Sequence, residues 1–476
     1  MGRSLLFLVT GLTIITGIIQ VNNSERVTEI PEVSVDYYNA QQARNLSKSL
    51  IDNAVETMKA NNNWTGSIRM SEVVDTMALI ARSNNARKDF TRGDITMDEL
   101  KEIEENLQAQ IENSESYSSG IEMTGELTSY TESSTNKPSN NSVGSWDEYK
   151  VLLVSTTQYD DIEVTTEVLM QRDSYSKYSY NTQSELSASG STIWFMDADN
   201  IHGPIHTNGQ FAMSGSPSFY GLVTSPNMWR AHSTNPTSPN FYGGENFNAP
   251  EKASPTSYEI GKIASAATSD GLRFNNQIYV RFFESSGVGY ARIWERSGSS
   301  WTSPVDYDLS GTNGIISASG RVDVYGEVKG EITLHSETLV EIDGDITYVT
   351  SPLADSSSTD MLGIVSEGDV RIDANAHAFS GTQDLTVHGS IMAVNTSFYV
   401  ENYNYCCAKG TLNLLGGLIQ ANRGPVGTFS GSTIYSGYSK NYQYDNRLKA
   451  SIPPTFPRES VFSIVYWKDE VTKLSD

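Results

Sequence analysis

The longest apolar stretch of the chain lies at its start. Arg3 is followed by a mostly apolar run of 15 residues from Leu5 to Ile19, and the next charged side chain is Glu25. A helix needs roughly 20 residues to cross a bilayer, so this run is short for a membrane span. We predict an anchor and assembly helix, followed by a polar break, over residues 1–32. Its packing side chains would be Leu5, Leu6, Phe7, Leu8, Val9, Leu12, Ile14, Ile15, Ile18 and Ile19.

Two other interpretations of this run stay open. A secretory signal peptide also begins with a short basic segment and an apolar stretch, but it ends in small residues at a cleavage site. The run ends in Ile18-Ile19-Gln20, which offers no such site. A plain membrane anchor is the second alternative, and in either of the uncleaved cases the chain would sit in a membrane first.

Helical periodicity resumes after the break, which contains Pro31. Apolar residues recur at three- and four-residue spacing, which predicts an amphipathic helix that needs a partner for one face. They are Ala43, Leu46, Leu50, Ala54 and Met58. Asn61–Asn63 should end this helix, and Thr96 with Glu99 has the spacing of a capping box at the start of another. We therefore predict a helical region over residues 33–113.

The pattern changes to that of a β protein further along. Residues 114–148 are rich in Ser, Thr and Asn and are predicted to be a linker or loop. Alternating apolar residues predict a β-rich domain over residues 149–310, with a strand at Ile193–Met196 and a hairpin over residues 278–294. Five prolines between residues 225 and 258 predict a long surface excursion within it.

A repeat dominates residues 311–460. The motif apolar-x-apolar-x-Gly-x-apolar occurs four times, with its glycines at Gly326, Gly344, Gly389 and Gly416, and Val370–Ile372 resembles a degenerate fifth copy. Short repeated strands that bury one face on the next form β-solenoids, so we predict these glycines at equivalent places on successive rungs. An ordinary sandwich is the alternative. With residues 461–476 as a C-terminal strand or tail, the predicted class is α+β, mainly β.

The charge and the cysteine content limit the partners and the covalent cross-links that the chain could have. The chain has 33 basic and 57 acidic residues, a net charge of -24, which disfavours nucleic acid as a partner because phosphates need Lys and Arg. The two cysteines are adjacent, Cys406 and Cys407, and cannot close a long loop with each other. A vicinal disulfide, two incidental free thiols and a cross-link between subunits all stay open.

Candidate catalytic and metal-binding chemistry is sparse. His202 and His206 flank Gly-Pro, which excludes a helical zinc face and favours a turn with two surface histidines. Residues 197–200 have carboxylates at a calcium-loop spacing without the rest of that loop, so Ca²⁺ is the only cofactor left open. Four acids lie near the expected turns, and we expect their side chains to be solvated and not to be catalytic: Asp343, Asp345, Glu367 and Asp369. We therefore expect no enzyme, and we expect Tyr435, Tyr438, Tyr442 and Tyr444 to pack beneath loops.

The N-terminal layout resembles that of type IV pilin-like proteins. Gly2–Leu6 and Asp36–Asn45 occupy the places of the apolar helix start and of the second helical segment in that group. Later stretches resemble the large minor-pilin-like proteins that end in a β-rich domain of unknown function, and the resemblance spans residues 1–60 and about 150–470. These stretches are Tyr175–Tyr180, Ile193–Met196, Gly203–Gly209, Gly363–Ile372, Asn422–Gly427, Gly437–Asp445 and Pro453–Pro457.

The resemblance implies a structural subunit of an extracellular pilus-like filament. Its partners would be copies of itself or other pilin-like subunits, with the inner membrane holding it before assembly. Pilins usually carry Glu at the fifth mature position, whereas this chain has Leu5 or Phe7 there, and its first acid is Glu25. A major or a minor subunit therefore both stay open. The alternative function is a cell-surface β-helix protein that binds or cleaves polysaccharide.

Overall fold

The computed structural model divides the chain into two compact units, Met1–Arg172 with Val461–Asp476, and Asp173–Ser460. No described helix is long and apolar enough to span a membrane. The predicted assembly helix lies outside the described residues. These are residues 29–60, 66–69, 96–99, 101–103, 105, 123–138, 143–197, 199–378, 383–405, 407–430 and 433–474.

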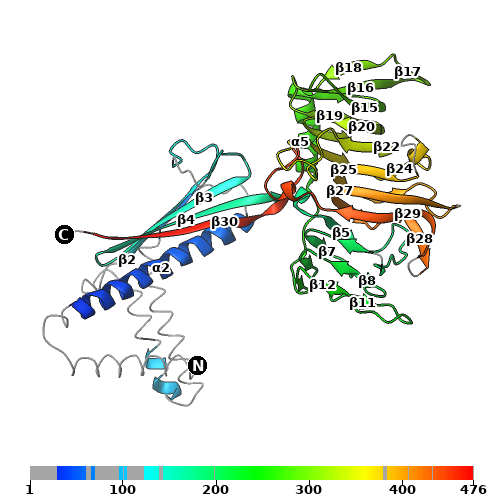
Figure 1. Cartoon of the computed structure of the whole chain (residues 1–476). Coiled ribbons are helices and arrows are strands. Elements are labelled where there is room, and N and C mark those ends of the chain that lie inside the picture. The colour runs from blue at the N-terminus through cyan, green and yellow to red at the C-terminus, as the bar shows by residue number, and fades with distance from the viewer. Residues whose placement is uncertain are drawn as a thin grey trace. The chain divides into compact units, whose positions relative to one another are not determined.

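The first unit combines one long helix with a five-stranded sheet (Figure 1). The helix α2 is Glu29–Ala60, so Pro31 falls in its first turn, where a missing N–H leaves no hydrogen bond unmade. The sheet order is β1-β2-β3-β4-β30, and the first three pairings are antiparallel. The strands are β1 (Ser67–Arg69), β2 (Met123–Tyr130), β3 (Lys150–Tyr159), β4 (Ile162–Ser174) and β30 (Arg458–Lys473).

The predicted apolar face of α2 is the face that packs on this sheet. All five side chains of the pattern are at most 8% exposed, and Leu46, Leu50, Ala54 and Met58 share one core cluster with Leu127, Val151, Leu153, Val168 and Met170. Burial of each large apolar side chain contributes roughly 1.5–3 kcal/mol.

The predicted capping box is confirmed as well, since the backbone N–H of Thr96 donates to Glu99 Oε2 (2.7 Å) and the Glu99 N–H donates to Thr96 Oγ1 (3.3 Å).

Two boundaries expected from composition are wrong. The predicted linker over residues 114–148 contains β2, which pairs along its whole length with β3. The predicted helical region contains β1, which pairs with β2. Polar composition concealed β2 because Leu127 is the one large apolar side chain of this strand that is fully buried, beside Gly125 and Ser129, and the other face carries Thr and Glu.

The second unit consists mainly of strands that pair in parallel with later strands of the chain (Figure 1). One ladder runs β14-β19-β21-β23-β25-β27-β5-β7-β10-β13, and every pairing in it is parallel. A second runs β15-β20-β22-β24-β26, and a third β27-β29-β6-β9-β12. The helix α5 (Ser257–Asp270) packs through Ile260 and Ile263 on a side cluster of the same unit.

The strand bounds of the second unit are as follows. In its first half they are β5 (Tyr180–Ser184), β6 (Asn200–Ile201), β7 (Ile205–Thr207), β8 (Ala212–Met213), β9 (Ser218–Phe219), β10 (Val223–Thr224), β11 (Arg230–Ala231), β12 (Asn240–Phe241), β13 (Glu245–Asn246), β14 (Leu272–Phe274), β15 (Ile278–Ser285), β16 (Val288–Ser297) and β17 (Ser300–Trp301). In its second half they are β18 (Val305–Asp308), β19 (Ile315–Ala318), β20 (Val322–Val328), β21 (Glu331–Ser336), β22 (Val340–Tyr348), β23 (Met361–Ser366), β24 (Val370–Ile372), β25 (Leu385–Ala393), β26 (Phe398–Val400), β27 (Ala408–Asn422), β28 (Gly427–Ser430) and β29 (Thr433–Gln443). Short 3-10 helices are η2 (Tyr175–Lys177), η3 (Ala376–Ala378) and η4 (Asn446–Lys449).

The core of the second unit is a column of apolar side chains contributed by one strand after another. In the first ladder, paired residues at one register position are all at most 5% exposed: Ile316, Leu334, Ile364, Ile391, Leu418, Tyr180, Ile205 and Val223. The apolar residues of the repeat motif supply equivalent positions in the other ladders, because Val322, Val340, Val370 and Phe398 are successive partners. Each strand thus buries its inner face on its neighbours.

Two expectations for residues 149–310 need correction. Ile193–Met196 is not a strand, and in its place Thr192 and Phe195 each form an isolated bridge. The proline-rich stretch over residues 225–258 is not only an excursion, since β12 and β13 pair in parallel with β9 and β10. The predicted hairpin is confirmed as β15 and β16, and its turn at Ser286-Gly287 has positive φ at both residues, as a type I′ turn requires.

The register places only two of the four repeat glycines opposite each other. Gly389 and Gly416 are direct partners in β25 and β27. Gly326 lies opposite Ile346, because the β20–β22 ladder shifts register after Val324. Gly344 falls within that shift and lies opposite no glycine. Two extra residues of β22 at this point move Gly344 out of register with the glycines of the other copies.

Candidate functional site

The histidine pair splits between the interior and the surface. His206 is fully buried, with Nδ1 2.8 Å from Thr224 Oγ1 and Nε2 2.8 Å from Asn208 Oδ1, and burial lowers its pKa. His202 instead stacks on the ring of Tyr220. The expectation of two surface histidines is therefore wrong for His206.

The acids at residues 197–200 are engaged by the protein itself. Asp197 Oδ1 accepts a hydrogen bond from the Ser216 backbone N–H (2.6 Å). Asp199 accepts from the Met196 N–H (2.8 Å) and pairs with Lys440 Nζ at 3.0 Å. Asp199 is thus held by a lysine side chain, and Asp197 is held at the backbone of residue 216.

The other candidates are placed as follows. Asp343 and Asp345 lie within β22 and not at a turn, which corrects their expected position. Tyr438 and Tyr444 are buried as expected, while Tyr435 is 62% exposed. Cys407 is disulfide-bonded, so the interpretation as two free thiols is wrong, and Cys406 lies outside the described residues.

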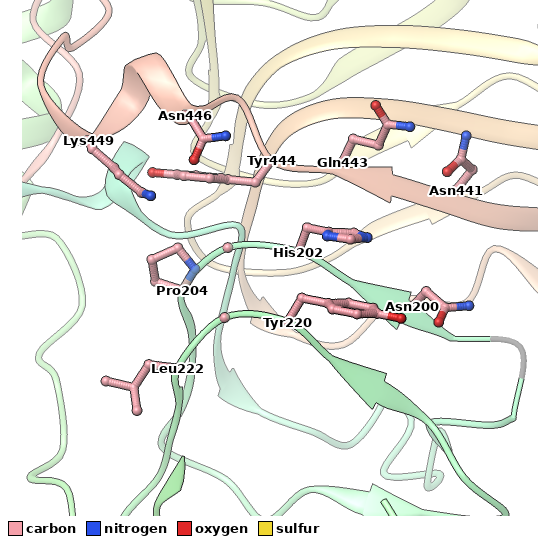
Figure 2. Close-up of a pocket in the computed structure, with 12 residues that line it drawn as sticks. Asn200, His202, Pro204, Tyr220, Leu222, Asn441, Gln443, Tyr444, Asn446 and Lys449 are labelled. Carbon is pink, nitrogen blue, oxygen red and sulfur yellow. The ribbon is translucent and has the colours of Figure 1, made fainter. Parts of the chain in front are cut away.

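One surface cavity, which we call the amide cavity, has a volume of about 570 Å³. Its walls come from β6 and the residues after it, from the residues just after β9, and from the end of β29 and the segment that follows it (Figure 2). Parallel pairing of β6, β9 and β12 aligns the residue that follows each strand, which stacks His202 on Tyr220 (ring centroids 4.4 Å apart) and Tyr220 on Tyr242 (5.1 Å). Gly203 has φ +88, and a Cβ there would lie 2.5 Å from the ring of Tyr444, so glycine lets that ring approach.

Amide side chains make up most of the polar lining of the amide cavity. Its polar lining is Asn200, Asn441, Gln443, Asn446 and Lys449, with no carboxylate among the described lining residues (Figure 2). Amides donate and accept hydrogen bonds but do not transfer protons near neutral pH. The stacked rings of His202 and Tyr220 cover each other's faces and present their edges to the cavity.

A second cavity, which we call the aromatic–carboxylate cavity, has a volume of about 530 Å³. Tyr279 on β15 lies opposite Trp294 on β16, with ring centroids 5.5 Å apart, and Trp301 on β17 lies 6.3 Å from Tyr279. Ile278 and Val280 on either side of Tyr279 are fully buried, so alternation along β15 turns Tyr279 outward. The ring planes meet at 58–60°, which gives the cavity inclined aromatic walls.

Polar side chains of the adjacent strands form the rest of the wall of this cavity. Asp323 is the β20 partner of Tyr279, and Glu341 is the β22 partner of Asp323. Asp323 accepts hydrogen bonds from Gln277 Nε2 (2.8 Å) and Arg321 Nε (2.5 Å). Arg321 also pairs with Glu341 (3.0 Å), so these planar groups hold one another in place.

Asp343 is the carboxyl of the cavity with the most altered acidity. The pKa of Asp343 is raised to about 7, mainly by burial and also by the nearby carboxylates of Asp323, Glu341 and Asp373, against the opposing effect of Arg321. Among the described residues, the acids of this surface form two groups whose carboxylates lie close enough together to share a metal ion. Both groupings include Glu341, which already contacts guanidinium groups, and those groups would compete with a cation.

The substitution Asp343→Asn should remove a pH dependence of folding. The pKa of this carboxyl rises from 3.8 to about 7 on folding, so the wild type should lose stability relative to the variant as pH rises from about 4 to about 7 and stay level above that. This pKa difference corresponds to a change in the free energy of unfolding of at most about 4 kcal/mol. Partial solvent exposure of Asp343 reduces the expected change to on the order of 1–2 kcal/mol. Urea unfolding across this pH range measures it. The control is Glu327→Gln, which removes a charge at an exposed position of β20, and a pH-independent difference for Asp343→Asn would contradict the assignment.

Sequence reasoning did not single out Tyr279, Trp294 or Trp301. A usable signal was present, because Tyr279 and Trp294 occupy outward positions of an otherwise apolar alternating hairpin. An aromatic ring on the solvent face of a strand is a candidate contact residue. The pairing of that hairpin with β20 could not be read from the pattern.

Comparisons with known proteins give two findings. Residues 153–227 match a family model described as a domain of unknown function, DUF4900. The crystal structure of the competence-associated pilin ComZ from Thermus thermophilus is matched at 10% sequence identity over 74% of this chain and 84% of that chain, with a TM-score of 0.28. No curated protein matches the chain. The matched family model thus covers a minor part of the chain, and its function is undefined.

Proposed function

We propose that this protein is a structural subunit of an extracellular pilus-like filament, assembled through its N-terminal apolar run. The observation that carries the proposal is the helix α2 laid across an antiparallel sheet, directly after that run in the chain. A rigid helix-on-sheet head fixed to an apolar helix is a suitable shape for a subunit whose helices pack in a filament core. The residue-level resemblance to pilin-like proteins points to the same role.

The second unit would then be the part displayed on the filament surface. We infer that its parallel ladders form a β-solenoid, since each strand buries its inner face on the strands before and after it. A net charge of -24 suits an exported and solvated surface. The partners would be copies of this chain or other pilin-like subunits, and the chain would reside in the inner membrane before assembly.

The proposal predicts that a charge within the apolar run blocks incorporation into fibres. Leu8→Glu in the full chain would bury an unpaired carboxylate between helices, at a cost of several kcal/mol, so the variant should be absent from the fibres while the cells still make it. Fibres sheared from cells are imaged by electron microscopy, and their subunits are identified by mass spectrometry. Asn248→Glu makes the same charge change at an exposed site and should be incorporated normally. Incorporation of Leu8→Glu at the wild-type level, or no intact chain in any fibre, would contradict the proposal.

A further inference from the structure

We propose that the aromatic–carboxylate cavity binds neutral saccharide units. The site combines the inclined rings of Tyr279, Trp294 and Trp301 with planar polar side chains of the neighbouring strands, around a space of about 530 Å³. This volume lies within the roughly 300–1,000 Å³ typical of small-molecule sites. The proposal does not depend on the assembly of the chain into filaments.

The aromatic wall supplies the apolar half of sugar recognition. A pyranose ring has one face of C–H groups that packs on an aromatic face, while its hydroxyls need polar partners. Trp301 is 39% exposed, and such an aromatic surface is favourably covered by an apolar ligand face. The rings of Tyr279 and Trp301 are tilted by 58° and do not cover each other, unlike the stacked rings of the amide cavity.

The polar wall supplies groups of both hydrogen-bonding senses. Each sugar hydroxyl donates and accepts, so it pairs best with fixed carboxylates beside fixed N–H donors. Hydrogen bonds from Gln277 and Arg321 fix the orientation of the Asp323 carboxylate in the protein without ligand. Preorganised polar groups reduce the entropy that binding would otherwise cost.

The charge of the lining favours a neutral ligand over a charged one. Arg321 neutralises Asp323, and Asp343 with a pKa of about 7 is partly protonated near neutral pH. A cationic ligand would meet the guanidinium of Arg321. An anionic uronate would meet Asp343, which is partly ionised near neutral pH, and Asp323, whose charge Arg321 already balances.

Binding is tested on the full chain with neutral oligosaccharides as probes: maltohexaose, cellohexaose, xylohexaose and mannohexaose. Tryptophan fluorescence and saturation-transfer NMR follow each titration, with oligogalacturonate and chitosan oligomers as charged comparisons. We expect at least one neutral probe to bind with a Kd below about 10 mM and more tightly than either charged set. No neutral binding in this range, or tighter binding of a charged set, would overturn the proposal.

Variants locate the binding in this cavity. Trp301→Ala and Asp343→Leu should each weaken binding of the neutral probe by about tenfold or more, because they remove the ring face and a hydrogen-bonding group. The matched control is Trp467→Ala, whose side chain is 41% exposed on β30 in the other unit, and its affinity should equal that of the wild type. Circular dichroism confirms that each variant is folded. Binding that survives both cavity variants, or that is lost in Trp467→Ala, would place the saccharide elsewhere and overturn the assignment.

Discussion

Replacing Arg423 by Met should destabilise the second unit by about 3–5 kcal/mol. The side chains of Arg423 and Glu185 are 4% and 2% exposed, and their charged atoms lie 3.1 Å apart. Arg423 also donates to the carbonyl of Ile193 (3.1 Å), and its guanidinium lies 3.7 Å from the centroid of the Phe195 ring. Removing the guanidinium leaves the carboxylate of Glu185 buried without its cation, which is the costly part of the change.

Urea unfolding followed by circular dichroism measures this loss, and two further variants interpret it. Glu185→Met combined with Arg423→Met removes both charges and should recover most of the stability, because a buried ion pair often exchanges for apolar groups at little net cost. Arg292→Met breaks an exposed pair with Asp306, in which the side chains are 37% and 42% exposed, and should lower the stability far less than the change at Arg423, because solvent screens the pair. Equal losses for the buried and the exposed pair would refute the explanation.

The second large effect is expected for Gly416→Ala, at about 3 kcal/mol or more. A Cβ at Gly416 would lie 2.0 Å from the carbonyl oxygen of Gly389, its partner in the neighbouring strand. Its φ of +144 is also a conformation that residues with a Cβ rarely adopt. Backbone strain costs of order 1–3 kcal/mol, and crowding in a packed interior adds a similar amount.

A second glycine provides the control for this substitution. Gly261 lies on α5, and a Cβ added there meets nothing within 4 Å. Gly261→Ala should therefore stabilise the protein by up to about 1 kcal/mol, since alanine favours the helix. Thermal unfolding of both variants should show shifts of opposite sign. A Gly416→Ala variant as stable as the wild type would show that the two strands do not approach as closely as described.

The amphipathic helix and the repeat strands were predictable because each carries a local and repeated pattern. Residues of α2 at three- and four-residue spacing share one face of a helix, and they are the residues that are buried. The motif around Val322 and Val340 alternates with a period of two, which sets its inner face before any partner is known. The β15–β16 hairpin was predictable as well, because two alternating apolar runs lie on either side of a short glycine-containing segment.

Features that depend on distant pairing were missed or misplaced. Strand β2 has a polar composition and becomes a strand only beside β3. Short strands such as β12 have two residues and little pattern of their own, so their parallel partners decide their conformation. The expected equivalence of Gly344 with the other glycines failed because a register shift is a property of two paired strands.

Residue type and short-range spacing are enough to specify the apolar N-terminal run, the buried face of α2, the alternating inward residues of the second unit and the acidic composition, because each of these is complete in one segment. Which strands are neighbours, and therefore which outward side chains meet, follows from the packing of the folded chain. Tyr279, Asp323 and Glu341 come from three strands far apart in the chain, and parallel pairing alone brings them into one row. The register of that pairing arises from the packing of the whole core, and local sequence does not encode it.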